Sequence, residues 1–292
     1  MRMILLATVV LGLTASSVPA AAPAPEWVEF PSATTPPTPF ALKQAKARGI
    51  ELKQEPGTPL RGLLVRPEGK GPFPAVVLLH GCDGIQPFEE QWAGDLVAWG
   101  YAALLVDSHG PRGIGDDCTS VDPTADNRTF DAFGALAHLR GLPFIDRTRI
   151  GVVGWNTGGS IVMLVVDETG VQQHFEPGFA AGVAFYPIHW SMGEPAAPLL
   201  MLLGGKDDCA PAAQVQRAMQ EVQHGPFPLR VEVLPDAGHG FDDPRFAKPV
   251  HLEQALSCRY WGKNTGATLA YSKAAHEAAV ELVRAFLEEH LK

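Results

Sequence analysis

The chain has 292 residues, of which 46% are hydrophobic and 19% are charged, and its formal net charge is −9. This length suits one large α/β domain or two small ones, and the composition is that of a globular protein with a full core. The acidic balance, with no run of basic residues, argues against nucleic acid or an anionic membrane surface as a partner.

Residues 1–22 are typical of a secretory signal peptide. Arg2 supplies a positive charge, an apolar stretch follows from Ile4 to Leu13, and Ala20-Ala21-Ala22 is one of two A-x-A-like cleavage sites. The apolar stretch is short for a bilayer span, and an uncleaved N-terminal anchor is the alternative. We therefore expect an exported protein, periplasmic or secreted, with no membrane contact after cleavage.

Export affects how the four cysteines, Cys82, Cys118, Cys209 and Cys258, are interpreted. An even number in an oxidising compartment indicates two disulfides, and three pairings are possible. Because no CxxC motif is present, a zinc ribbon or thioredoxin-like site is not expected. Proximity in the expected fold favours Cys82–Cys118 and Cys209–Cys258.

Regular alternation of strand and helix patterns begins near residue 45, after a Pro/Ala-rich stretch at 23–44 that we interpret as a linker or extended arm. The expected strands are short and rich in Val and Leu, as in strands buried on both faces: Leu60–Val65, Pro74–Leu79, Ala102–Val106, Ile150–Val153, Ala181–Phe185, Leu199–Leu203 and Val231–Leu234. The expected helices are Phe88–Trp99, Thr129–Leu139, one from Thr157, Ala212–Val222 and Lys273–Leu291.

Such alternation predicts one α/β domain over residues 45–292, with a mostly parallel central sheet and helices on both faces. In an open sheet of this kind, ligands bind at the carboxyl ends of the strands. Polar residues that directly follow the strands are therefore the candidates for a functional site.

The sequence Gly154-Trp155-Asn156-Thr157-Gly158 lies between an apolar strand and an apolar helix. A Gly-x-nucleophile-x-Gly pattern in that position is the nucleophile elbow of the α/β-hydrolase fold, whose glycines avoid clashes in a strained turn. The central residue is normally a nucleophile, but Asn156 has no ionisable nucleophilic group. The pattern thus predicts a catalytic scaffold without its usual attacking residue.

A second motif, His80-Gly81-Cys82-Asp83-Gly84, follows the second expected strand. Small-residue loops at this place supply one donor of an oxyanion hole, so the expected donors are the backbone N–H groups of Cys82 and Thr157. The alternative interpretation is a simple turn between strand and helix.

An acid and a histidine follow two later strands, in the order expected for a catalytic triad. Asp207 is the expected carboxylate, with Asp208 as the fallback, although an aspartate there also suits the N-cap of the next helix. His239, between two glycines, is the expected general base that Asp207 orients. A solvent-exposed, inert histidine is the alternative.

Together these motifs resemble the dienelactone hydrolase family. The similarity includes His-Gly-Cys-x-Gly at 80–84, Gly-Trp-x-x-Gly-Gly at 154–159, Gly-Lys-Asp-Asp at 205–208 and Gly-His-Gly-Phe at 238–241, and it covers roughly residues 55–290. The resemblance implies an α/β-hydrolase fold and hydrolysis of a small-molecule ester or lactone by a Ser or Cys nucleophile with Asp and His, with no metal or other cofactor.

Asn156 departs from that pattern, and several explanations are open. Another residue could attack, with Thr157, Ser160 and Cys82 nearest; Asn156 could deamidate to aspartate; or the change could be engineered. A hydrolase is the first interpretation because the rest of the site is intact. The alternative is a non-catalytic pseudoenzyme that binds a small ligand in the retained pocket.

Four residues are candidates for substrate binding. Trp155, Tyr186 and Trp190 favour an apolar or aromatic group, although aromatic residues there are as often core packing. Arg112 could hold a substrate carboxylate, or could pair with Asp116 or Asp117. The oligomeric state is expected to be monomer or dimer.

Overall fold

A computed structural model describes residues 24–34, 37, 39–51, 56–115, 118, 125–222, 225–255, 258 and 266–292. The expected signal peptide, residues 1–22, lies outside this part of the chain. Among the described helices, none combines the length and the apolar character that a membrane span requires.

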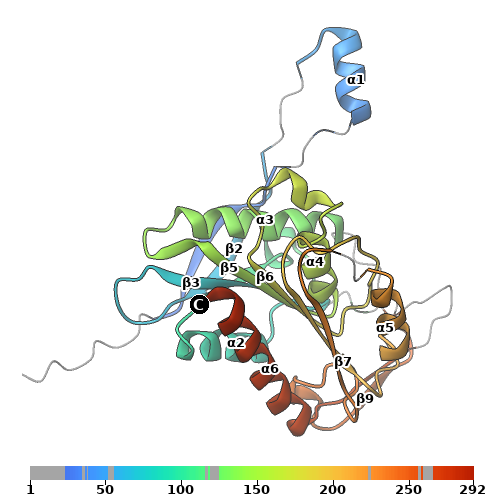
Figure 1. Cartoon of the computed structure of the whole chain (residues 1–292). Coiled ribbons are helices and arrows are strands. Elements are labelled where there is room, and N and C mark those ends of the chain that lie inside the picture. The colour runs from blue at the N-terminus through green and yellow to red at the C-terminus, as the bar shows by residue number, and fades with distance from the viewer. Residues whose placement is uncertain are drawn as a thin grey trace, which may run out of the picture.

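An eight-stranded sheet forms the centre of the protein (Figure 1). Its order is β1-β2-β4-β3-β5-β6-β7-β8. Strand β2 is antiparallel to both of its neighbours, β1 and β4, and the remaining neighbouring pairs, β4-β3, β3-β5, β5-β6, β6-β7 and β7-β8, are parallel. The strands are β1 (Glu26–Pro31), β2 (Pro59–Val65), β3 (Phe73–Leu79), β4 (Ala102–Asp107), β5 (Ile145–Trp155), β6 (Ala181–Phe185), β7 (Leu199–Gly204) and β8 (Leu229–Leu234). All seven expected strands are present, and the mostly parallel sheet is confirmed.

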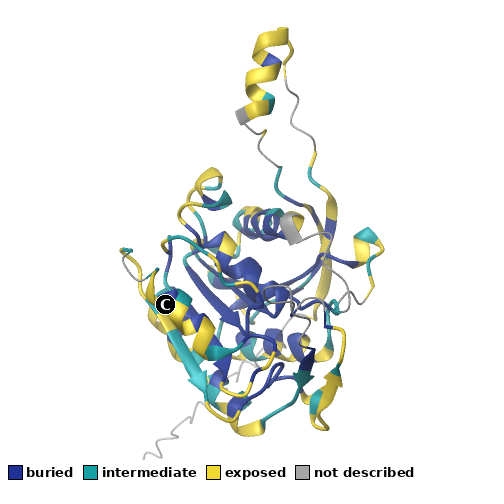
Figure 2. Ribbon diagram, turned by 90° about the vertical axis from the view of Figure 1, so that its right-hand side faces the viewer, coloured by how far each residue is buried: buried dark blue, intermediate teal, exposed yellow. Residues whose placement is uncertain are grey.

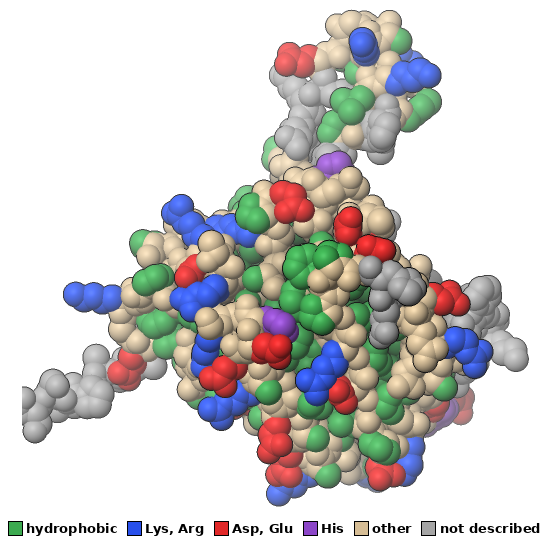
Figure 3. Space-filling model, viewed as in Figure 1, with side chains coloured by type: hydrophobic (Ala, Val, Ile, Leu, Met, Phe, Trp, Pro, Cys, Tyr) green, Lys and Arg blue, Asp and Glu red, His purple; other side chains and the backbone are tan. Residues whose placement is uncertain are grey.

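Strand β1 differs from the expectation that residues 23–44 are only a linker or arm. It pairs with β2 along its full length, from Glu26 opposite Leu64 to Pro31 opposite Pro59, and the side chain of Phe30 is buried. Phe30 is the only buried side chain of β1, so this edge strand contributes little to the core. Helix α1 (Pro39–Arg48) follows and projects away from the sheet (Figures 1 and 3).

Helices cover both faces of the sheet. Helices α2 (Pro87–Ala98) and α6 (Lys273–Leu291) pack on one face, and α3 (Ala125–Gly141), α4 (Thr157–Val165) and α5 (Ala212–Gln220) pack on the other. The smaller elements are η1 (Gly110–Arg112), η2 (Val171–His174), η3 (Pro244–Phe246), β9 (Val250–Leu252) and β10 (Ala267–Leu269). The predicted helices therefore all occur, with α3 beginning four residues earlier than expected.

Strand β3 shows how the sheet divides the core into two layers. Val76 and Leu78 face α2 and α6, whereas Ala75, Val77 and Leu79 face α3 and α4, as the period of two requires. All five side chains are buried, and Figure 2 shows the same continuous burial across the central strands. Burial on both faces explains why these strands are apolar runs without alternation.

The turn from β5 into α4 depends on close backbone approach at two glycines. A Cβ at Gly158 would overlap the carbonyl oxygens of Leu79 and His80, and one at Gly154 would overlap the carbonyl of Gly158. Without side chains at these positions, the first turn of α4 lies directly against the end of β3 and against the end of β5. These close approaches confirm the steric reason for glycine at both ends of the elbow.

We predict that Gly158→Ala lowers the free energy of unfolding by about 3 kcal/mol, because the added methyl group must displace backbone. Gly94→Ala is the matched control: Gly94 is exposed on α2 and its Cβ would meet nothing within 4 Å. The control is expected to gain roughly 0.5–1 kcal/mol from helix propensity. Urea unfolding of the three proteins checks this, and equal stability of Gly158→Ala and wild type would contradict it.

Candidate active site

Asn156, Asp207 and His239 follow the carboxyl ends of β5, β7 and β8, and the fold brings them together at one edge of the sheet. Asn156 has φ 52° and ψ −115°, a conformation that non-glycine residues rarely adopt. Its backbone N–H donates to Phe185 O on β6, which fixes the turn to the sheet. The side chain of Asn156 therefore stands at the tip of the turn, as a nucleophile would.

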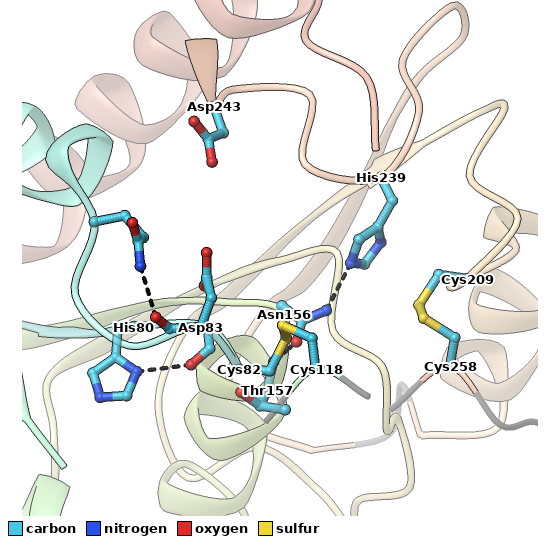
Figure 4. The surroundings of a disulfide bond; sticks show 12 residues. His80, Cys82, Asp83, Cys118, Asn156, Thr157, Cys209, His239, Asp243 and Cys258 are labelled. Carbon is cyan, nitrogen blue, oxygen red and sulfur yellow. Dashed lines mark hydrogen bonds between the residues drawn. A yellow bond between two sulfur atoms is a disulfide. The ribbon is translucent and has the colours of Figure 1, made fainter. Parts of the chain in front are cut away.

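Hydrogen bonds align these three residues in a relay. The Oδ1 atom of Asp207 accepts from the backbone N–H groups of Cys209 and Ala210, and its Oδ2 atom lies 2.8 Å from His239 Nδ1. His239 Nε2 lies 2.7 Å from Asn156 Nδ2 (Figure 4). All three side chains are buried, so water competes little for these bonds.

The positions of the protons follow from the donors. The backbone N–H of Thr157 can only donate, and it lies 2.7 Å from one Asn156 side-chain atom, which must therefore be Oδ1. The other atom is then the NH2 group, which donates to His239 Nε2. Nε2 must carry a lone pair, so the proton of the neutral imidazole sits on Nδ1 and points at Asp207. This tautomer is the one that a general base requires.

The oxyanion-hole donors are only partly available. The Thr157 N–H, one of the two expected donors, already bonds to Asn156 Oδ1. Cys82, the other expected donor, lies at the cavity and is joined to Cys118 by a disulfide.

The second disulfide joins Cys209 to Cys258, so the expected pairing is confirmed, and two disulfides are compatible with export.

Alternative nucleophiles near the elbow are already engaged. The hydroxyl of Thr157 accepts from Arg128 Nη1 at 2.8 Å. Ser160 Oγ accepts from the backbone N–H of His189, and Cys82 has no free thiol. None of the three candidates therefore presents an activated group to His239.

A cavity of about 60 Å³ opens beside the relay. It is bordered by the loop at residues 80–84, the elbow, the two disulfides and the segment after His239, and its lining is mostly apolar. Figure 4 shows the two disulfides near Asn156 and His239. Among the described residues, the only close group of potential metal ligands is Cys82, Asp83 and Cys118, and two of these are joined by a disulfide. The expectation of no metal stays a prediction.

Two of the four expected substrate residues line this cavity, namely Trp155 and Tyr186. The ring of Tyr186 packs 4.8 Å from the His239 ring, while its hydroxyl donates to buried Asp242 at 2.7 Å. Trp155 Nε1 also donates to Asp242, at 2.8 Å. Both residues therefore present aromatic ring surface to the cavity, because their polar atoms are already hydrogen-bonded to Asp242.

The other two expected substrate residues, Arg112 and Trp190, do not line it. Arg112 forms a bidentate ion pair with buried Asp131, at 2.7 and 2.8 Å, so its guanidinium is already paired with a carboxylate of the protein. Asp116 and Asp117, the expected partners, lie outside the described residues. Trp190 packs at the edge of the core on the α3 and α4 face.

Asp208 has a different role from the two considered for it. Its carboxylate accepts from the backbone N–H and the hydroxyl of Thr268, at 2.8 and 2.6 Å. Asp208 therefore binds β10 to the loop after β7. The N-cap position of α5 belongs to Pro211, and Asp207 alone faces the histidine.

Three buried polar residues of the site went unnoticed in the sequence. Arg128 donates to Thr157 Oγ1 and to the carbonyl of His80, and so links the elbow to the loop at residues 80–84. Glu89 accepts from the backbone N–H groups of Gly81 and Gln86. Asp242 accepts from Trp92, Trp155 and Tyr186; burial raises its pKa, and these three donors oppose the rise. Only Asp242 had a signal, its position three residues after His239.

The sheet, the elbow and the acid and histidine after β7 and β8 define an α/β-hydrolase fold. The model of the dienelactone hydrolase family matches residues 60–291, and the chain belongs to that family.

Relatives of known name show the same likeness. Carboxymethylenebutenolidase of Pseudomonas putida is 26% identical over 209 residues, which is 66% of this chain and 85% of the relative. Among solved structures, a dienelactone hydrolase-like promiscuous phosphotriesterase from metagenomic libraries has a TM-score of 0.62 at 19% identity, covering 91% of this chain and 99% of the other. Dienelactone hydrolase from Anabaena variabilis has a TM-score of 0.55 at 20% identity, covering 80% and 93%.

His80 connects the site to the pH dependence of stability. Its Nδ1 lies 2.7 Å from Gly81 O and its Nε2 accepts from Ser108 N–H at 3.3 Å, so the neutral ring is satisfied in place. Burial, with the nearby charge of Arg128, lowers its pKa well below the ordinary value. Below about pH 6.5, His80 is therefore protonated in the unfolded chain but stays neutral in the folded protein. The free energy of unfolding falls as the pH falls through this range.

We predict that His80 alone contributes a slope of about 1.4 kcal/mol per pH unit between its folded pKa and about pH 6.5. His80→Gln removes the titrating group, and the slope of unfolding free energy against pH is expected to become shallower by that amount. Urea unfolding between pH 5 and 8 checks this. His174→Gln, at an exposed position, is the control and should retain the wild-type slope; equal slopes in all three proteins would contradict the prediction.

Proposed function

We propose that the protein hydrolyses small-molecule esters or lactones, with His239 acting as general base on a water molecule. The observation that carries this proposal is the Asp207–His239 pair, whose Nε2 lone pair faces the elbow at the cavity. Because Asn156 has no nucleophilic group, water is the attacking group. Family membership supports the reaction class, and the name of the Pseudomonas relative specifies a butenolide, an unsaturated lactone.

The reaction follows from the donors and acceptors around the cavity. The substrate carbonyl oxygen takes the place of Asn156 Oδ1 at Thr157 N–H, with Cys82 N–H as the second donor, and Asn156 turns away from His239. Nε2 takes a proton from water as the water oxygen bonds to the carbonyl carbon. The imidazolium then protonates the leaving alkoxide as the ester C–O bond breaks. No metal or cofactor takes part.

Several features limit the substrate and the place of action. The small, mostly apolar cavity, with Trp155 and Tyr186 in its wall, favours a compact ester with an apolar acyl group. We propose that the chain acts after export, in the periplasm or outside the cell, because its two disulfides need an oxidising compartment.

One observation favours a second function, that of a non-catalytic binding protein. Asn156 Oδ1 accepts from Thr157 N–H, and the Asn156 NH2 group donates to His239 Nε2. These polar groups are therefore hydrogen-bonded to one another without a substrate. A ligand that fills the cavity without displacing Asn156 would be bound and left unchanged.

We predict slow hydrolysis of a short-chain nitrophenyl ester by the wild type. In enzymes that lose the triad nucleophile, the remaining site still accelerates hydrolysis about 10³–10⁴-fold over water. His239→Ala is expected to lower the protein-dependent rate about 100-fold or more, whereas Asn156→Ser is expected to raise it by orders of magnitude. An inert wild type beside an active Asn156→Ser variant would contradict the hydrolase proposal and favour the binding function instead.

Asp207 and Asp208 offer a matched pair for the orienting carboxylate. Asp207→Asn presents an amide to His239 Nδ1 and favours the wrong tautomer, so we expect a loss of about 100-fold or more in the hydrolysis rate. The Asp208 carboxylate bonds to Thr268 and not to His239, so Asp208→Asn is expected to change the rate less than about threefold. Steady-state assays of both variants check this; equal effects of the two substitutions would contradict the role assigned to Asp207.

A further inference from the structure

The amide of Asn156 is itself held in the arrangement that a substrate carbonyl would need. Its Oδ1 accepts from Thr157 N–H at 2.7 Å, and its Nδ2 lies 2.7 Å from His239 Nε2. The first contact polarises the C=O bond, and the second places Nε2, which can donate a proton once it has been protonated, beside the nitrogen. Asn156 is thus the best-placed amide in the site, and it cannot diffuse away.

We propose that Asn156 is a self-modification site, at which the Asp207–His239 pair hydrolyses the side-chain amide to an aspartate. The proposal rests on the same general base as the proposed function, but it needs no substrate. It requires only one water molecule, which reaches the amide through the cavity that Asn156 and His239 both line.

The step balances without any further reactant. The hydrogen bond from Asn156 Nδ2 to His239 Nε2 first opens, which frees the Nε2 lone pair for a water molecule. Nε2 then accepts a proton from this water while the water oxygen bonds to Cγ of Asn156, and the negative charge on Oδ1 is stabilised by Thr157 N–H. The imidazolium then gives that proton to Nδ2, the Cγ–Nδ2 bond breaks and ammonia leaves. The products are one carboxyl group and one ammonia, and His239 returns to its neutral form.

The usual route of asparagine deamidation is opposed by the same geometry. That route needs the backbone nitrogen of the next residue to attack Cγ, and it gives a mixture of aspartate and isoaspartate. Here the nitrogen belongs to Thr157, the first residue of α4, and its N–H is already directed at Oδ1. Direct hydrolysis by water gives aspartate alone, so the product distinguishes the two routes.

The modification would change the chemistry available at the elbow. A carboxylate forms covalent intermediates in several enzyme classes, whereas an amide does not. The new carboxylate would keep one oxygen at Thr157 N–H and would place the other beside His239. The elbow would therefore acquire the nucleophile that the translated sequence lacks.

The test follows the elbow peptide by mass spectrometry while purified full-length protein is kept in water enriched in oxygen-18. We expect aspartate at position 156 to accumulate with one oxygen-18 and without isoaspartate. Asn127 and Asn264, read from the same digests, are internal controls for spontaneous deamidation. An amide that stays intact at position 156, or a product that contains isoaspartate, would overturn the proposal.

Variants show whether the histidine is responsible. His239→Gln is expected to slow conversion about 100-fold or more, and His174→Gln, at an exposed position, is expected to leave it unchanged. Asp207→Asn supplies a second disruption of the relay, in case His239→Gln does not fold. The wild type can already carry aspartate at position 156 when it is purified. If His239→Gln retains the amide under the same conditions, that result supports the proposal equally. Conversion at the wild-type rate in both relay variants would overturn it.

The outcomes separate this proposal from the proposed function. Ester hydrolysis by protein that retains the Asn156 amide would support the hydrolase and overturn the self-modification. Conversion of Asn156 in protein that hydrolyses no ester would do the reverse.

Discussion

The hydrogen bond between Asn156 Nδ2 and His239 Nε2 fixes the arrangement of this site before any substrate enters. Thr157 N–H fixes which atom of the amide faces the histidine, and the amide in turn fixes the lone pair on Nε2. The proton on Nδ1 then points at Asp207, whose other oxygen is held by two backbone N–H groups. Asp207, His239 and Asn156 are therefore all hydrogen-bonded while the imidazole is neutral. The attacking group, water, is not part of this arrangement and must enter through the cavity.

The backbone of the elbow makes this contact possible. Glycines at positions 154 and 158 let the first turn of α4 lie directly against the ends of β5 and β3, and Asn156 stands in this turn at a positive φ. Arg128 and the disulfide between Cys82 and Cys118 hold the neighbouring loop on the other side of the cavity. The strain at Asn156 is thus supported by contacts from several elements, as is common at functional sites.

The parts of the site that could be predicted are those with a local signal. The apolar strands, the glycines of the elbow and the order of Asp207 and His239 after their strands each depend on residues close together in the sequence. By contrast, the pairing of Arg112 with Asp131 and the convergence of Trp92, Trp155 and Tyr186 on Asp242 join residues from separate elements. Which of Asp207 and Asp208 faces the histidine depends on the loop path, and only the structure shows it.

The central claim is that water, rather than a side chain, attacks the ester. Intact-protein mass spectrometry of freshly purified wild type during turnover of an activated ester tests it most directly, with Asn156→Ser as the control that can form an acyl-enzyme. The account predicts that wild type that retains the Asn156 amide releases product without gaining the mass of an acyl group. An acyl adduct on the wild-type chain, or the absence of any product, would contradict it.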